Sequence, residues 1–269
     1  MVRVYKIFML SLITFAALMA TKPKIIGYYP YYRYTTYPPS EMPLSDITHV
    51  MHSFVWPGSD GQLIVPNDFF SITPDLVSRA HDNGAKVILS IGGGGNGEYF
   101  DAVFADSTLR SDFMFSLIDI YHEYGYDGID IDWEQPDSYA DKLNLNKFVI
   151  ELHDYIHTWD LDWSISIAVP PTDWRGKFYQ ASTLMQYVDW FGIMTYDFYG
   201  SWSSTTGFNA SLYKDAADPL NLNVDYCIRE YWHGQRQVPY DQMVSGIPFY
   251  GYKYSSADAP YKSFSSAEA

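Results

Sequence analysis

The chain has 269 residues, of which 47% are hydrophobic and 18% charged, a composition sufficient for one sizeable globular core. Its formal net charge of −15 disfavours a nucleic-acid partner, because phosphate binding requires a basic face. A single cysteine, Cys227, excludes an internal disulfide, so the fold must be stabilised by its core.

Residues 1–20 have the pattern of a secretory signal peptide: two basic residues near the start precede an apolar run that ends at the small residue Ala20. The run is short for a bilayer span. An uncleaved anchor stays an open alternative, because Leu18 fits the small-x-small cleavage rule poorly. We expect a secreted protein whose residues 21–269 form one domain that acts as a monomer, with no membrane contact after cleavage.

Short apolar runs alternate with helical patterns along the rest of the chain. The runs that predict strands are 24–29, 47–56, 86–91, 126–134, 163–169, 188–195 and 243–249. The patterns that predict helices are 73–84, 106–124, 138–158, 176–187 and 223–233. This alternation indicates a parallel sheet with right-handed crossovers. The polar segment after Tyr254 shows no strand pattern.

The fourth run, 126–134, carries three carboxylates at alternate positions of a segment that otherwise has the composition of a buried strand. Residues two apart in a strand face the same side, so Asp130, Asp132 and Glu134 would share one face. Burying three like charges is costly unless they serve a function, which favours catalytic carboxylates. A metal site is the alternative, although the glycine and bidentate glutamate of a calcium loop are missing after Asp130.

The same residues carry a family resemblance. DGIDIDWE, residues 127–134, resembles the signature DGxDxDWE of family 18 glycoside hydrolases, the chitinases and their relatives. SIGG at residues 90–93 is similar to the SxGG motif of this family, and MTYD at residues 194–197 to its MxYD motif. The match runs from about Lys24 to Tyr254. It implies an α/β fold, the (β/α)8 TIM barrel, here truncated after the seventh strand.

The resemblance also implies a chitinase, which hydrolyses β-1,4-linked N-acetylglucosamine in chitin or its oligosaccharides with retention and without a cofactor or metal. Glu134 would be the general acid and base, and the substrate's own acetamido oxygen would form an oxazolinium intermediate. Asp132 would steady this intermediate and exchange a proton with the buried Asp130, while Tyr196 binds the acetamido oxygen. We expect like-charge proximity to raise the pKa of Glu134. The residues implied to support or line the sugar site are Tyr28, Phe54, Ser90, Gly93, Met194 and Asp197.

Three positions depart from the family pattern. Gly94 stands where many chitinases have an aromatic residue, Gln135 where tyrosine usually follows the glutamate, and Tyr252 where arginine is common. The first departure indicates a barer +1 subsite. Two alternatives stay open: an endo-β-N-acetylglucosaminidase that acts on glycans or peptidoglycan, and a chitin-binding lectin on a catalytically weak barrel.

Two further motifs point elsewhere. Gly92, Gly94 and Gly97 spell G-x-G-x-x-G, but the acidic residues that follow come over thirty positions later, so we interpret these glycines as allowing a close backbone approach. His153 and His157 lie four apart on a predicted helix and would be able to share a metal. Because no glutamate follows His153 as in HExxH, we interpret them as a solvated helix face.

Overall fold

The computed structural model describes residues 23–268. The predicted signal peptide, residues 1–20, lies outside them. Within the described part, no helix combines the length and the hydrophobicity that a bilayer crossing requires.

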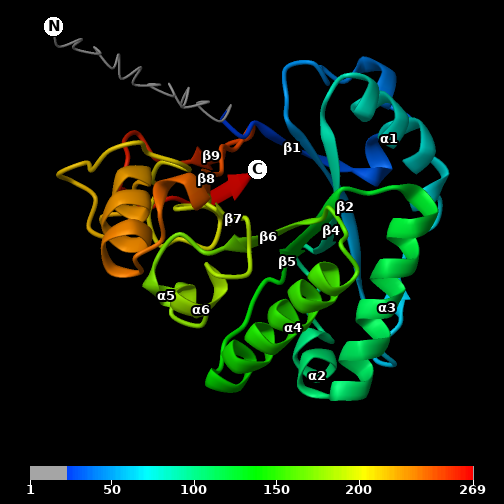
Figure 1. The fold of residues 1–269 in the computed structure, drawn as a ribbon. Helices are drawn as coiled ribbons and strands as arrows, with labels where there is room; N and C mark the ends of the chain where they lie inside the picture. Colours follow the sequence, from blue (N-terminus) through cyan, green and yellow to red (C-terminus); the bar gives the residue numbers. More distant parts are fainter. Residues whose placement is uncertain (1–22, 269) are drawn as a thin grey trace, which may run out of the picture.

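Seven parallel strands form the central sheet in the order β1-β2-β4-β5-β6-β7-β8 (Figure 1). They are β1 (Ile26–Pro30), β2 (His49–Pro57), β4 (Lys86–Gly92), β5 (Gly128–Asp132), β6 (Ser164–Val169), β7 (Trp190–Ile193) and β8 (Met243–Ser245). A short β3 (Leu63–Ile64) pairs antiparallel with the end of β2. The sheet curls with helices on its outer side, which confirms the predicted barrel architecture over seven strands.

The helices connect successive strands. They are α1 (Thr73–Asp82), α2 (Phe100–Ala105), α3 (Ser107–Tyr124), α4 (Tyr139–Thr158), α5 (Asp173–Gly176) and α6 (Ala181–Leu184). The predicted signals at the ends of α3 are both present. The side chain of Asp106 accepts hydrogen bonds from the first turn, and the chain leaves the helix at Gly125 with a φ of 74°, a conformation that favours glycine.

The strand predicted over 126–134 is shorter than expected, because β5 ends at Asp132 and Glu134 lies beyond it. Three further segments differ from the prediction. The predicted helix 176–187 is instead the two short helices α5 and α6. Between them the buried Tyr179 donates a hydrogen bond to the carbonyl oxygen of Trp133, a long-range contact that local propensity does not anticipate. The predicted helix 223–233 is a π-helix, η4 (Tyr226–Gln235). In the polar tail, β10 (Ser266–Glu268) pairs antiparallel with β9 (Lys253–Ser255), although its residues are poor strand formers.

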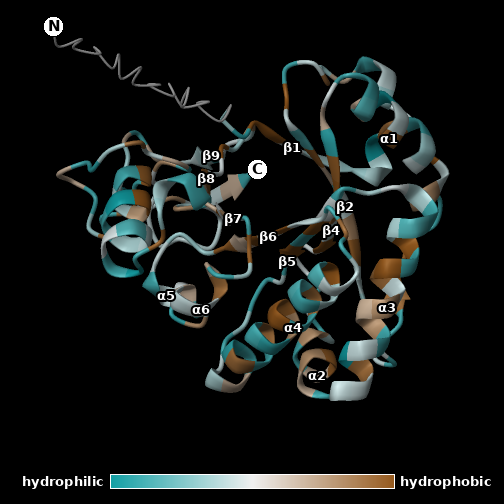
Figure 2. Cartoon of the chain, in the orientation of Figure 1, coloured by the Kyte–Doolittle hydropathy of each residue, from teal (hydrophilic) through white to brown (hydrophobic). Residues whose placement is uncertain are grey.

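The apolar side chains of the strands are divided between the two faces of the sheet, and Figure 2 shows hydrophobic residues along the strands and helices. Ile129, Ile131 and Trp133 belong to the main core under the helices, where Phe100 stacks on Trp133 with ring centroids 5.5 Å apart. A separate cluster on the inner face consists of Met51, Ile88 and Trp190. This inner cluster fills the barrel below the carboxylates, so the next layer towards the strand ends can be polar.

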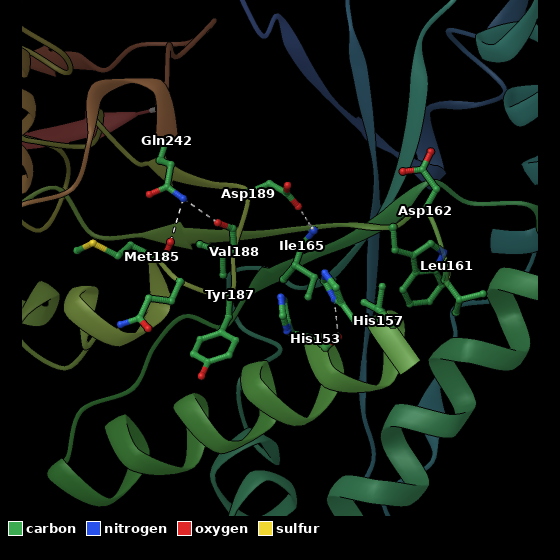
Figure 3. Close-up of a pocket in the computed structure, with 13 residues that line it drawn as sticks. His153, His157, Leu161, Asp162, Ile165, Met185, Tyr187, Val188, Asp189 and Gln242 are labelled. Atoms are coloured by element: carbon green, nitrogen blue, oxygen red, sulfur yellow. Dashed lines mark hydrogen bonds between the residues drawn. The ribbon is translucent and has the colours of Figure 1, made fainter. Parts of the chain in front are cut away.

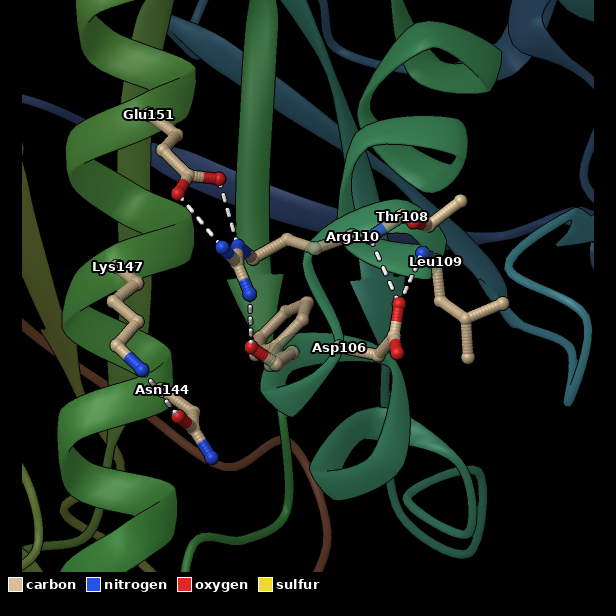
Figure 4. Close-up of polar contacts among 8 residues, drawn as sticks. Asp106, Thr108, Leu109, Arg110, Asn144, Lys147 and Glu151 are labelled. Atoms are coloured by element: carbon tan, nitrogen blue, oxygen red, sulfur yellow. Dashed lines mark hydrogen bonds and ion pairs between the residues drawn. The ribbon is translucent and has the colours of Figure 1, made fainter.

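A buried arginine joins three helices behind the acidic strand (Figure 4). Arg110 of α3 is 6% exposed, and it donates to both carboxylate oxygens of Glu151 on α4 at 2.7 and 2.8 Å. Its third hydrogen bond, 2.7 Å, reaches the carbonyl oxygen of Phe104 in α2. The ring of Phe104 packs edge-on against Trp133, with centroids 5.6 Å apart. Because bidentate charged hydrogen bonds are strong, this contact fixes the helices against the strand that carries the acids.

Candidate active site

Asp130 occupies the middle of β5 and is 1% exposed. The sheet register places Ser90 of β4 and Ser166 of β6 directly beside it. Each serine hydroxyl donates to one carboxylate oxygen at 2.7 Å, and the Tyr28 hydroxyl donates at 2.9 Å. Burial raises the pKa of Asp130, and these three donors oppose that rise because they favour the charged form. The carboxylate is therefore fixed in one orientation.

The ring of Tyr28 extends from this buried contact to the surface. The residue is 47% exposed, although its hydroxyl reaches Asp130. Burial of that hydroxyl and the charges of Asp130 and Asp132 raise the pKa of Tyr28 well above its ordinary value, so the phenol stays a donor.

Asp132 ends β5 and is 6% exposed. Among the described residues its Oδ1 atom has no hydrogen-bond partner, although the atom is buried. Burial, followed by the charges of Asp130 and Glu134, raises the pKa of Asp132 well above its ordinary value. An unpaired buried carboxylate oxygen is costly, so Asp132 is a site where a ligand group would be stabilised.

Glu134 lies two residues beyond the end of β5 and is partly buried. Burial is the larger cause that raises the pKa of Glu134, and the charge of Asp197 adds to the rise. The direction matches the prediction, and like-charge proximity contributes to it, but burial is the largest cause. The nearby acids are Asp197 and also Asp132, whose own pKa the charge of Glu134 raises. The segment that carries Glu134 is held by Tyr179, whose hydroxyl donates to the carbonyl oxygen of Trp133 at 3.0 Å.

The glycine run after β4 packs against this segment. A Cβ atom on Gly92 would lie 2.2 Å from the carbonyl oxygen of Asp132, and φ at Gly92 is 111°, so only glycine fits. A Cβ on Gly93 would meet the ring of Phe54 at 2.6 Å. A Cβ on Gly94 would lie 3.7 Å from Oε1 of Glu134 without hindrance. The glycines thus allow close packing around the acids, and the G-x-G-x-x-G spacing is explained without a nucleotide.

Asp197 contributes a further carboxylate from the segment after β7. Its backbone has a φ of 55°, and its N–H donates to the side-chain oxygen of Asn209 at 2.8 Å. The hydroxyls of Tyr250 and Tyr252 donate to Oδ1 of Asp197 at 2.8 and 2.9 Å. Tyr252, which departs from the family pattern, therefore provides a neutral donor where arginine is common.

Tyr196 and Met194 lie on the same segment and are partly buried. A Cβ on Gly246 would lie 2.6 Å from the ring of Tyr196, so the loop after β8 packs directly against that ring. Burial raises the pKa of Tyr196, and the charges of Asp132, Glu134 and Asp197 add to the rise, in that order. Its hydroxyl is therefore a neutral donor close to the three acids.

The ten predicted site residues thus come from four strands, β1, β2, β4 and β5, from the residues that directly follow β4 and β5, and from the segment after β7. They are Tyr28, Phe54, Ser90, Gly93, Asp130, Asp132, Glu134, Met194, Tyr196 and Asp197. Sequence reasoning missed the roles of Ser166, Tyr179 and Tyr250. Ser166 has a detectable signal, because a serine in the apolar run 163–169 is unusual, but the tyrosines carry none.

Residues 24–268 match the model of the glycosyl hydrolases family 18. The chain belongs to glycoside hydrolase family 18. The motif resemblance predicted this family, and the match confirms it over nearly all described residues.

The relatives in this family include chitinases. Endochitinase 1 of Metarhizium robertsii is 30% identical over 261 residues, and the alignment covers 85% of this chain but 60% of that protein. The chain thus spans less than two thirds of the length of this relative. Among solved structures, the Group IV chitinase of Ostrinia furnacalis in complex with allosamidin superposes with a TM-score of 0.80 at 24% identity, covering 92% of this chain and 72% of that one. The chitinase-like agglutinin of Robinia pseudoacacia gives a TM-score of 0.76 at 24% identity, covering 91% and 76%. The structural likenesses show a shared fold.

Proposed function

We propose that this family 18 chain is a chitinase that cleaves β-1,4-linked N-acetylglucosamine with retention. The observation that carries the proposal is the row of acids on β5 and just after it: a fixed Asp130, a buried Asp132 with an unpaired oxygen, and a partly exposed Glu134 two residues beyond the strand. The name of the Metarhizium relative supports the substrate class.

In the first step, Glu134 donates its proton to the glycosidic oxygen while the bond from that oxygen to the anomeric carbon breaks. The acetamido oxygen of the same sugar attacks the anomeric carbon and forms an oxazolinium ion. Because burial and the charge of Asp197 raise the pKa of Glu134, this carboxyl retains its proton closer to neutral pH than an ordinary glutamate does.

Asp132 stabilises the positive intermediate through its unpaired oxygen, which would accept a hydrogen bond from the acetamido N–H. The neighbouring Asp130 remains hydrogen-bonded to its three donors, and its negative charge adds to the stabilisation of the oxazolinium ion. Glu134, now a carboxylate, removes a proton from a water molecule that attacks the anomeric carbon. The oxazolinium ring opens, and the two inversions give net retention.

The decisive experiment replaces Glu134 by glutamine and measures both turnover and binding of an N-acetylglucosamine oligomer. We expect turnover to fall by about 10²–10⁴-fold, the usual contribution of a general acid and base, with binding nearly unchanged. Glu123→Gln, at an exposed position of α3, is the matched control and should leave turnover unchanged. Retained turnover in Glu134→Gln would remove the assignment.

The same measurements distinguish the alternatives. A lectin would bind the oligomer without turnover in the unsubstituted protein, and an endo-β-N-acetylglucosaminidase would prefer glycans or peptidoglycan to chitin oligomers. We further propose secretion, on the pattern of residues 1–20, and a monomeric state.

A further inference from the structure

Asn209 lies in the long segment between β7 and η4 and is partly buried. Its side chain hydrogen-bonds in two directions. The amide oxygen accepts from the backbone N–H of Asp197 at 2.8 Å, and Nδ2 donates to the carbonyl oxygen of Tyr250 at 3.0 Å. A backbone N–H only donates and a carbonyl only accepts, so these two partners fix the orientation of the amide.

The two partners of Asn209 also contact each other. The Tyr250 hydroxyl donates to Oδ1 of Asp197 at 2.8 Å, so the three residues form a closed ring of hydrogen bonds. The backbone of Asn209 adds a further contact, because its carbonyl oxygen accepts from the N–H of Phe198 at 3.1 Å. Asp197 has a φ of 55°, a conformation that a residue other than glycine keeps only where its surroundings hold it.

The strand that leads to Tyr250 is fixed at its start. Gln242 directly precedes β8, and its Nε2 donates to the carbonyl oxygens of Met185 and Val188 at 3.0 and 3.1 Å (Figure 3). The loop after β8 then extends to Tyr250, where Asn209 supplies a contact from 41 positions away in the sequence. The amide of Asn209 thus joins this loop to the segment after β7.

Asp197 is one of four titratable residues that surround Glu134. The others are Asp132 at the end of β5, Tyr196 beside Asp197, and Tyr179 between α5 and α6. Burial, and after it nearby carboxylates that include Glu134, raise the pKa of each of these three. Burial and then the charge of Asp197 raise the pKa of Glu134. Since the interaction of two charges depends on their distance, the placement of Asp197 affects the proton affinity of Glu134.

We propose that Asn209 is a positioning residue of the active site, which fixes the carboxylate of Asp197 relative to Glu134. The consequence for turnover rests on the proposed function, whereas the placement of Asp197 does not. Without the amide, Asp197 loses the acceptor of its N–H, and the backbone of Tyr250 loses its donor. A carboxylate that is held less closely repels Glu134 less, so the pKa of Glu134 should fall.

The test is carbon-13 NMR of the side-chain carboxyl of Glu134, which gives its pKa without any need for turnover. In Asn209→Ala we expect a lower pKa of Glu134 than in the unsubstituted protein, shifted in the same direction as in Asp197→Asn but by less. Asn209→Ser, whose hydroxyl is too short to reach both partners, should give the same direction and is the second variant where alanine impairs folding. Circular dichroism establishes that each variant is folded.

Ser211→Ala is the matched control. Ser211 lies two residues later in the same segment, and its hydroxyl donates to the carbonyl oxygen of Leu222 at 2.8 Å. The substitution therefore also removes a side-chain hydrogen bond to a carbonyl oxygen but leaves the ring of Asn209 intact. The pKa of Glu134 should be unchanged in this variant.

A second comparison separates the positioning of Asp197 from a general loosening of the loop. In the background of Asp197→Asn, Asn209→Ala should no longer change the pKa of Glu134, because the charge through which Asn209 acts is absent. An equal change in both backgrounds would overturn the proposal, as would an unchanged pKa in Asn209→Ala.

The effect on turnover distinguishes this proposal from the proposed hydrolysis. In Asn209→Ala, the alkaline limb of the profile of kcat against pH should move to lower pH by the shift that NMR measures. A protein that shows the NMR shift but does not cleave N-acetylglucosamine oligomers would refute the hydrolysis and leave the positioning role standing. A cleaving enzyme without the NMR shift would refute the positioning role alone.

Discussion

Replacing Asp132 by asparagine should make the protein more stable at neutral pH and less active. Asp130 and Asp132 are both buried and two residues apart on β5, which separates them by about 6.6 Å at a rise of about 3.3 Å per residue. Two charges at that distance repel by about 2.5 kcal/mol at an effective dielectric constant of about 20. Asparagine has nearly the same shape and removes this repulsion.

The pH dependence of the free energy of unfolding determines at which pH the substitution should stabilise the protein. The pKa of Asp132 is higher in the folded than in the unfolded chain, so the folded state binds more protons and loses stability as pH rises above the unfolded value of about 4. Below that pH the carboxyl is protonated in both states, and the substitution should be neutral. Above that pH, the gain in free energy of unfolding should approach about 2 kcal/mol. It stays below the full repulsion of about 2.5 kcal/mol, because protonation of Asp132 in the folded state already relieves part of that repulsion.

Urea unfolding at pH 7.5 and at about pH 3 measures the free energy of unfolding near both limits. At the higher pH, a gain of about 2 kcal/mol would raise Tm by about 4–8 °C for a chain of this size. Asp119→Asn, at an exposed position of α3, changes the net charge equally and should have little effect. A variant no more stable than the unsubstituted protein at pH 7.5 would refute the reasoning that burial and repulsion act together at Asp132.

Two further predictions concern other carboxylates. Asp197→Asn removes a charge that raises the pKa of Glu134, so the general acid should lose its proton at lower pH. The alkaline limb of the profile of kcat against pH should therefore move to lower pH, and an unmoved limb would contradict the assigned interaction. Glu151→Gln weakens the bidentate contact of Arg110 and should lower the free energy of unfolding, measured in urea, by about 1.5–3 kcal/mol. An unchanged free energy would mean that this contact does not contribute to stability.

The strands and the acidic row could be predicted because both depend on local patterns. The alternation of Ile129, Asp130, Ile131 and Asp132 is a period-two signal, and the structure divides these side chains between the core and the polar inner layer as that period requires. The ends of α3 were likewise predictable from single residues with local hydrogen-bonding or conformational roles.

The family resemblance implied Tyr28, Ser90 and Asp197 as site residues. The remaining partners and the contacts themselves could not be predicted, because they depend on register and on long-range packing. Ser166 reaches Asp130 only through the pairing of β5 with β6, and Tyr179 reaches the segment of Glu134 from 46 residues away. The neighbour that raises the pKa of Glu134 is Asp197, 63 positions later in the sequence. No local periodicity encodes such contacts.

Asp130 accepts hydrogen bonds from a serine on each adjacent strand, so the site is complete only when both strands are in the correct register. A shift of β4 or β6 by one residue would put leucine or isoleucine where Ser90 or Ser166 now donates, and would leave the central acid without that donor. Regain of hydrolysis after refolding from urea would therefore lag behind regain of helical signal whenever misaligned sheets form first. Enzyme assays then become a sensitive probe of how this barrel assembles.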